Sequence, residues 1–377
     1  MNNIPFNRPF ITGDEIKNIT QVIESRKLSG NGYFTKKCQE FFETKYGFRK
    51  TLLTTSCTDA LEMCAILAGI KEGDEVIVPS YTFVSTALAF VRQNAKIVFA
   101  DSSKENPNID VDKLEALITP NTKAIVPVHY AGVACDMDKI MELANKYNLI
   151  VIEDAAQSID SFYKGKPLGS IGHLSAFSFH ETKNINCGEG GLLVINDDKY
   201  IKRAEIIWEK GTNRAEFFRG EINKYGWVDT GSSFLPSEMN AAFLLAQLEN
   251  LDMIQSRRKE IWKLYYRNLE SLVLKGIINI PQLPAYSTNN GHMFYFTCRN
   301  IEERSSLIAY LKSNNVQSVF HYISLHLSDF YKLDHDGREL MNCDRYSDCL
   351  IRLPLFRDLK DEDVVEISNL IYKFYSN

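Results

Sequence analysis

The sequence predicts an α/β fold organised around a mostly parallel β-sheet, and three observations lead to this prediction. Short apolar runs recur between residues 51 and 195, and most are followed by a segment with the spacing of a helix. The runs are apolar throughout, as expected for strands covered by helices on both faces of a sheet. Beyond residue 250 the pattern changes to smaller α+β units. We therefore expect a large domain at 1–250 and a smaller C-terminal α+β domain at 251–377.

The individual elements follow from periodicity and from breaks at glycine. Helical spacing predicts two helices at the start of the chain, over residues 14–27 and 35–47, with glycines between them. The expected strands are residues 75–78, 96–100, 123–128, 149–153, 175–179 and 191–195, and the helices among and after them are 112–118, 136–147 and 198–211. After an irregular stretch at 211–233 we expect a long helix at 237–274, a strand at 293–297 and helices at 305–314 and 361–375.

The composition argues against several classes of function. The net charge is −5 and there is no basic run, which argues against nucleic acid as a partner. No apolar stretch reaches the roughly 18 residues of a membrane span, and the N-terminal residues lack the apolar core of a signal peptide. The eight cysteines form no Cys-x-x-Cys pair, as expected for reduced thiols in the cytoplasm. The histidines are dispersed, so we expect no metal site.

The stretch at residues 175–191, with Lys183 at its centre, is the strongest chemical signal. Small, polar and glycine residues surround this lysine. Upstream, the predicted strand at 149–153 ends at two acidic residues, Glu153 and Asp154. Ligands of parallel sheets bind beyond the carboxyl ends of the strands. Tyr81, His129, Asp154 and Lys183 each follow a predicted strand, so they are expected at one sheet edge. Lys183 is then either an ordinary surface cation or an amine that condenses with a carbonyl.

A second signal is the segment at residues 51–61, where a short apolar run leads through small hydroxyl residues into a helix. The first N–H groups of a helix lack carbonyl partners and lie at the positive end of its dipole, so Cys57 and Thr58 are candidates to bind phosphate. The alternative is that the Ser and Thr residues only cap the helix, and for this segment alone capping is the simpler interpretation.

Taken together, these residues suggest pyridoxal phosphate as the cofactor. This cofactor needs a lysine for a Schiff base, an anion at its ring nitrogen, a flat group on the ring face and a phosphate cradle. Lys183 and Asp154 are the candidates for the first two, and Tyr81 is the candidate to stack on the ring. The remaining candidates are Cys57, Thr58 and Ser178 for the phosphate and Gln157 for the ring hydroxyl.

The sequence resembles the sugar aminotransferases of the DegT/DnrJ/StrS family over nearly its whole length. The matching motifs are Thr55-Ser-Cys-Thr-Asp-Ala-Leu61, Pro79-Ser-Tyr-Thr-Phe83, Glu153-Asp-Ala-Ala-Gln157, Ser178-Phe-His-Glu-Thr-Lys183 and Gly188-Glu-Gly-Gly191. The resemblance implies the aspartate-aminotransferase fold (fold type I) with a seven-stranded sheet in the large domain. It also implies a homodimer with active sites at the subunit interface.

One stretch departs from the family pattern. Many members carry Gly-x-Asn-x-Arg before the long helix, and the asparagine reaches the phosphate of the neighbouring subunit's cofactor. Here Ser233 stands in the place of that asparagine, and Leu235 replaces the arginine. A serine hydroxyl is able to donate to phosphate, but over a shorter reach. The resemblance therefore leaves the contact of Ser233 with a neighbouring cofactor open.

Further stretches resemble those family members that use L-glutamate to aminate C4 of dTDP-4-keto-6-deoxy-D-glucose. These stretches are Ile4–Asn7, Gly30–Thr35, Val128–Cys135, Glu209–Arg214 and Phe320–Ile323. The resemblance implies dTDP-4-amino-4,6-dideoxy-D-galactose as the product, for surface polysaccharides such as O-antigen. Phe320, His321 and Tyr322 are then candidates to line the sugar pocket, although a structural role fits His321 equally well.

Several alternatives stay open at this point. The same reaction with the opposite stereochemistry gives the 4-amino-4,6-dideoxy-D-glucose epimer, and other family members aminate C3. Sugar dehydratases of the family carry histidine in place of the lysine, so Lys183 disfavours that chemistry. A non-catalytic sugar-nucleotide binder is disfavoured because Asp154, Gln157 and Lys183 are present together.

Overall fold

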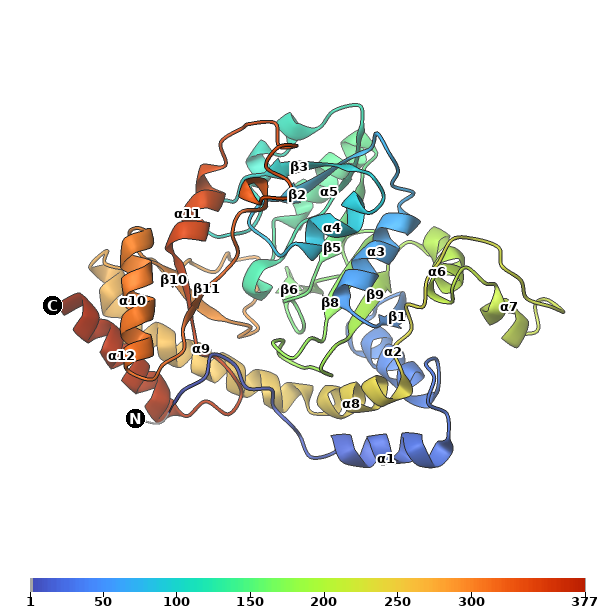
Figure 1. Ribbon diagram of the computed structural model, residues 1–377, viewed down its shortest axis with the longest axis horizontal. Helices are drawn as coiled ribbons and strands as arrows, with labels where there is room; N and C mark the ends of the chain where they lie inside the picture. Colours follow the sequence, from blue (N-terminus) through green and yellow to red (C-terminus); the bar gives the residue numbers. More distant parts are fainter. Residues whose placement is uncertain (1–2, 377) are drawn as a thin grey trace.

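A seven-stranded β-sheet runs through the larger part of the molecule in the computed structural model, which describes residues 3–376 (Figure 1). The strands lie in the order β1-β9-β8-β5-β4-β2-β3. Strand β9 is antiparallel to both of its neighbours, and all the other pairs are parallel. The strands are β1 Lys50–Thr54, β2 Glu75–Pro79, β3 Lys96–Ala100, β4 Thr122–Ile125, β5 Ile150–Asp154, β8 Leu174–Ser178 and β9 Gly191–Ile195. The mostly parallel seven-stranded sheet is therefore confirmed.

Both faces of the sheet are covered, because alternate residues of each strand enter different cores. In β9, Leu193 and Ile195 pack with α3 (Cys57–Leu67), α4 (Ser85–Val91) and α6 (Ile201–Trp208). Leu192 and Val194 point the other way, into a core shared with α2 and α8. The helices on that second side are α1 (Glu15–Ser25), α2 (Tyr33–Tyr46), α8 (Glu238–Glu249) and, towards β4 and β5, α5 (Met137–Tyr147). A small hairpin of β6 (Phe162–Tyr163) and β7 (Lys166–Pro167) follows β5.

A second hydrophobic core surrounds a three-stranded antiparallel sheet in the order β10-β12-β11. Its elements are β10 (Phe294–Thr297), β11 (Val319–Phe320), β12 (Leu350–Leu353), α9 (Leu251–Leu274), α10 (Ile301–Ser313) and α12 (Asp361–Ser376). Ile4, near the N-terminus, packs in this core and pairs with Val316. Tyr346 of α11 (Met341–Cys349) packs instead in the core of the large sheet. The chain therefore passes between the cores more than once, and the division at residue 250 stays a prediction.

Some predicted elements differ from the observed ones for local reasons. Residues 112–118 form two 3-10 turns, Val111–Lys113 and Glu115–Leu117, rather than one α-helix. The long helix predicted at 237–274 is interrupted at Asn250, whose side chain donates a hydrogen bond to the Ala246 carbonyl (2.9 Å). The helix predicted at 198–211 ends at Trp208, and the stretch at 211–233 contains the short helix α7 (Arg214–Phe218).

Candidate active site

A cavity of about 630 Å³ lies where the carboxyl ends of the large-sheet strands face the small sheet. Asp154 is the last residue of β5 and Ser178 the last of β8, and both line the cavity. Lys183, in the turns that follow β8, lines it as well. The carboxyl ends of these strands meet at one edge, as the α/β topology requires. The predicted convergence of Asp154 and Lys183 is thus observed.

Lys183 is held in a tight turn, with its N–H donating to the His180 carbonyl (2.9 Å). Burial lowers the pKa of its ammonium group below the ordinary value, while the nearby Asp154 opposes the shift. A lysine with a lowered pKa has a larger share of neutral, nucleophilic amine. Burial therefore separates Lys183 from the solvated cations of the surface.

Asp154 is held by two hydrogen bonds inside the cavity wall. Thr86 in α4 donates its hydroxyl to Oδ2 (2.7 Å), and the Ala156 N–H donates to Oδ1 (3.1 Å). Burial raises the pKa of Asp154, and these hydrogen bonds, together with Lys183, oppose the shift. Thr86 was missed by sequence reasoning, because a threonine at the start of a helix is common for local reasons alone.

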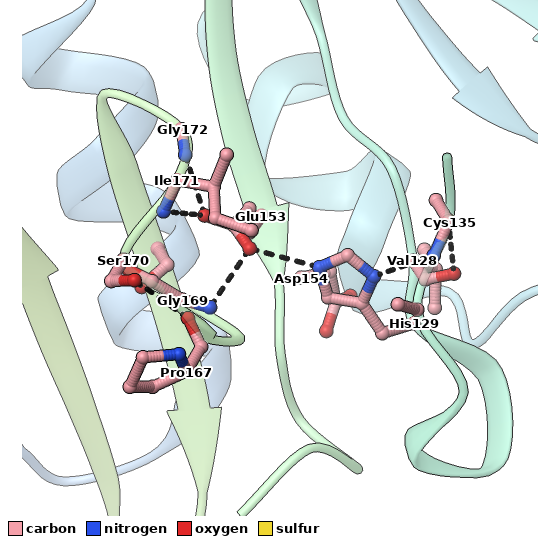
Figure 2. Close-up of polar contacts among 12 residues, drawn as sticks. Val128, His129, Cys135, Glu153, Asp154, Pro167, Gly169, Ser170, Ile171 and Gly172 are labelled. Atoms are coloured by element: carbon pink, nitrogen blue, oxygen red, sulfur yellow. Dashed lines mark hydrogen bonds and ion pairs between the residues drawn. The ribbon is translucent and has the colours of Figure 1, made fainter. Parts of the chain in front are cut away.

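Glu153, the neighbour of Asp154 in β5, points to the other side of the strand and ends in a saturated network (Figure 2). One carboxylate oxygen accepts N–H groups of Ile171 (2.8 Å) and Gly172 (2.6 Å). The other accepts the N–H of Gly169 (2.8 Å) and contacts Nε2 of His129 (2.9 Å). Burial alone would raise the pKa of Glu153, but these hydrogen bonds hold it below its ordinary value.

His129 belongs to this network and does not line the cavity, contrary to the shared edge that we expected for it. The N–H of Cys135 donates to Nδ1 (3.1 Å), so the proton of the ring lies on Nε2 and is directed at Glu153. The main-chain N–H of His129 donates to the Asp154 carbonyl (3.2 Å). His129 therefore holds the end of β5 in place from the side of the strand that faces away from the cavity.

Tyr81 is likewise absent from the cavity wall, which corrects its predicted role as the ring-stacking residue. Its side chain is 1% exposed and packs against Tyr130, Tyr322 and Tyr346. Phe83, two residues further along, lines the cavity and is 55% exposed. Residues beyond the end of β2 at Pro79 no longer follow strand alternation, so the sequence did not reveal which aromatic ring faces the cavity.

The start of α3 is capped by a side chain and also lines the cavity. Helix capping and phosphate binding, the two interpretations of this segment, are therefore compatible. Ser56 Oγ accepts the Asp59 N–H (3.0 Å), which makes it the N-cap. Cys57 and Thr58 line the cavity at the first helical turn, together with Ser178. A Cβ on Gly191 would lie 2.4 Å from the Ser56 carbonyl carbon, so glycine is required where β9 passes this turn.

The remaining predicted residues divide into two groups. Gln157 lines the cavity, accepts the Ala131 N–H (2.6 Å) and donates to the Tyr322 hydroxyl (3.1 Å). Phe320, His321 and Tyr322 line the cavity too, and His321 Nδ1 lies 2.6 Å from the Tyr130 hydroxyl. Ser233 is exposed on a segment paired with Glu209 and is not part of the cavity wall.

The cavity wall includes His292 and Arg352, two polar residues that had not been singled out in the sequence. His292 is buried and its Nδ1 lies 2.7 Å from Asn184 Oδ1. Arg352 lies in β12 of the small sheet. The signal for Arg352 was present as a single charge inside the apolar run Leu350-Ile-Arg-Leu-Pro-Leu355. Both residues come from the C-terminal part of the chain, where periodicity gave few clues to the site.

The residues present fit pyridoxal phosphate. A partly buried lysine amine and a buried carboxylate share one cavity, and a flat ring, that of Phe83, forms part of its wall. The N–H groups at the start of a helix and the Ser178 hydroxyl suit a phosphate group. This combination defines a class of protein, the lysine enzymes that use pyridoxal phosphate.

Comparison with known proteins agrees with this class. The profile of the DegT/DnrJ/EryC1/StrS aminotransferase family matches residues 9–372. The spore coat polysaccharide biosynthesis protein SpsC of Bacillus subtilis is 33% identical, over 97% of this chain and 95% of that protein. An uncharacterised protein of Methanocaldococcus jannaschii is 34% identical, over 99% and 97%. The putative sugar aminotransferase Spr1654 of Streptococcus pneumoniae, solved in its PMP form, superposes with a TM-score of 0.90 at 26% identity, covering 99% of both chains.

The chain belongs to the DegT/DnrJ/EryC1/StrS aminotransferase family. It is a pyridoxal-phosphate-dependent aminotransferase, and its fold is that of the solved members. No helix among residues 3–376 is long and apolar enough to cross a membrane.

Proposed function

We propose that this enzyme transfers the amino group of L-glutamate to C4 of dTDP-4-keto-6-deoxy-D-glucose, giving dTDP-4-amino-4,6-dideoxy-D-galactose. The product would serve cytoplasmic steps of surface polysaccharide synthesis. The observation that carries the proposal is the meeting of Lys183, Asp154 and Gln157 in one cavity. The names of SpsC and Spr1654, together with the motifs that resemble C4 aminotransferases, support a sugar as the acceptor.

The residues of the chain divide the work of the reaction. Bound pyridoxal phosphate supplies a carbonyl carbon that accepts the amino group and a ring that withdraws electrons. Lys183 would hold the cofactor, and its freed amine would remove and return the proton at the reacting carbon. Asp154, fixed by Thr86, would keep a proton on the ring nitrogen. Gln157 is positioned by Ala131 and Tyr322 and would contact the ring hydroxyl.

Aromatic side chains in the same cavity are suited to a sugar nucleotide. Phe320 is about half exposed and offers apolar surface to a ligand. His321 and Tyr322 lie side by side, with ring centres 3.5 Å apart. In the proposed homodimer, the exposed Ser233 of one subunit would approach the phosphate site of the other. That contact follows from the family resemblance and from the exposure of Ser233.

The test is a turnover assay of the holoenzyme with L-glutamate and dTDP-4-keto-6-deoxy-D-glucose, followed by NMR of the amino sugar. The proposal expects 2-oxoglutarate and a product with an axial amine at C4. An equatorial amine would identify the gluco epimer, and amination at C3 would require a different keto sugar as substrate. Absence of amino transfer to this keto sugar, in protein that binds the cofactor, would refute the proposed substrate.

A further inference from the structure

Arg352 is a cavity residue whose charge has no acidic partner among the described residues. Its neighbours in β12, Ile351 and Leu353, are buried in the core of the small sheet, and Arg352 is on the opposite side of the strand. Nη2 donates to the Phe320 carbonyl (3.3 Å), and the guanidinium carbon lies 4.7 Å from the centre of the Phe6 ring. Nε is buried and has no hydrogen-bond partner within residues 3–376.

Neither of the two acidic residues that line the cavity, Asp154 and Glu189, forms an ion pair with Arg352. Asp154 accepts hydrogen bonds from Thr86 and Ala156. Glu189 is 68% exposed and lies 3.6 Å from His180. A partly buried guanidinium without an anion is unfavourable, because it has lost water without gaining a charged partner. The contacts of Arg352 with Phe320 and Phe6 hold the side chain in place while leaving donors free.

Such a guanidinium is suited to an anion that arrives with a ligand, since its planar fork matches carboxylate and phosphate oxygens. The substrates of the proposed reaction offer both kinds of anion. Arg352 and Lys183 line the same cavity, and this shared location favours the anion that lies nearer to the reacting amine. The charge of Arg352 also adds to burial in lowering the pKa of Lys183. In an amino acid, a carboxylate is one carbon away from the reacting amine. In the sugar nucleotide, the diphosphate is attached at C1, across the sugar ring from C4.

We propose that Arg352 binds a carboxylate of the amino donor and thereby orients its amine towards Lys183. This inference rests on the proposed function for the identity of the donor. It assigns the small sheet a direct part in donor recognition, through a residue of β12. Arg352 does not take part in proton transfer, so its loss should weaken donor binding far more than it slows the bound reactants.

The test compares R352Q, R352K and R304Q holoenzymes. Arg304 is the matched control, because it also contacts Phe320, with its guanidinium 5.3 Å from the centre of the Phe320 ring, but does not line the cavity. Binding of glutarate, a dicarboxylate without an amine, and of thymidine diphosphate is measured by calorimetry. Steady-state KM values are measured for L-glutamate and for the keto sugar, and thermal unfolding reports the folding of each variant.

R352Q should weaken glutarate binding and raise the KM for glutamate by about 10- to 100-fold, the effect of losing a charge-assisted pair. Thymidine diphosphate binding should change less than about threefold on the same scale, and R352K should be intermediate because it keeps the charge without the fork. Unchanged glutarate binding in R352Q, or loss of thymidine diphosphate binding instead, would overturn the inference. If glutarate binding depends on Arg352 but the enzyme does not act on the keto sugar, the proposed function is refuted and the inference about Arg352 stands.

Discussion

Two neighbouring carboxylates at the end of β5 have opposite surroundings. Glu153 accepts four hydrogen bonds on a fully buried side of the strand (Figure 2). Asp154 accepts two hydrogen bonds and shares a cavity with Lys183 and Arg352. Among the described residues, no carboxylate lies within ion-pair distance of Lys183 or of Arg352. The difference shows how the site is built: groups that position the strand are saturated by the protein, and groups that meet ligands keep unused capacity.

The largest change is expected on the unsaturated side, at Lys183. Lys183→Ala should abolish the visible absorbance band of lysine-bound pyridoxal phosphate and reduce turnover by roughly 10⁴-fold, because the amine that moves the proton is lost. Lys164→Ala is the control, since Lys164 is exposed and paired with Asp138. A normal band in Lys183→Ala would show that another lysine holds the cofactor.

The saturated side should respond through stability. Glu153→Gln places an amide among donors that need a carboxylate, and we expect a loss of about 3 kcal/mol in the free energy of unfolding. The pKa of Glu153 is lowered in the folded protein. Its contribution to stability is therefore present above the ordinary pKa of 4.5 and is lost as the pH falls from there through the lowered pKa of the folded state. Denaturant unfolding of wild type and Glu153→Gln should therefore converge in acid. Equal stability of the two proteins at pH 7 would contradict the comparison.

Thr86 tests whether a hydrogen bond within the protein supports the ligand-facing carboxylate of Asp154. Thr86→Val removes the hydroxyl donor to Asp154 and keeps the side-chain shape. We expect turnover to fall by about 10-fold, the effect of losing one hydrogen bond to a charged group, while the unfolding temperature changes little. Thr86→Ser should restore most of the activity because it keeps the hydroxyl. Failure of Thr86→Ser to recover activity would point to packing rather than to the hydrogen bond.

The smallest effects should separate the two aromatic residues after β2. Phe83→Ala should weaken retention of the cofactor by a few-fold to about 10-fold, in line with the contribution of one aromatic contact. Tyr81→Phe should leave retention unchanged, because the Tyr81 hydroxyl has no hydrogen-bond partner among the described residues. Dialysis followed by measurement of bound cofactor checks both. The reverse order would restore the role first predicted for Tyr81.

The sequence was informative where chemistry follows directly from chain order. Apolar runs predicted the buried strands, and a residue at the end of such a strand, like Asp154 or Ser178, was correctly expected at the sheet edge. The number of strands and the cofactor chemistry were reinforced by family resemblance. The direction in which a side chain points was harder to predict. Tyr81 and His129 also follow strands, but their side chains turn into the interior, because the path of the backbone after the strand decides where they point.

The missed residues share another cause. Thr86 lies inside a helix, and His292 and Arg352 come from parts of the chain far from Lys183 in sequence. Their roles depend on contacts between distant segments, and no local pattern encodes such contacts. Long-range packing also explains why composition did not settle the division between domains. Ile4, near the N-terminus, packs in the core of the small sheet, and Tyr346, from the C-terminal part of the chain, packs in the core of the large sheet.

The N-terminal segment has a consequence for the order of events in folding. The Phe6 N–H donates to Gln317, 311 positions later, and Phe6 lies against Arg352. Asn7 donates to the Glu181 carbonyl (3.1 Å), in the turns that lead to Lys183. Contacts between such distant residues form slowly, because a long loop must close before they are made. During synthesis we expect this side of the cavity to stay open until residues 317 and 352 have emerged, and in refolding experiments the recovery of donor binding should lag behind the recovery of helical signal.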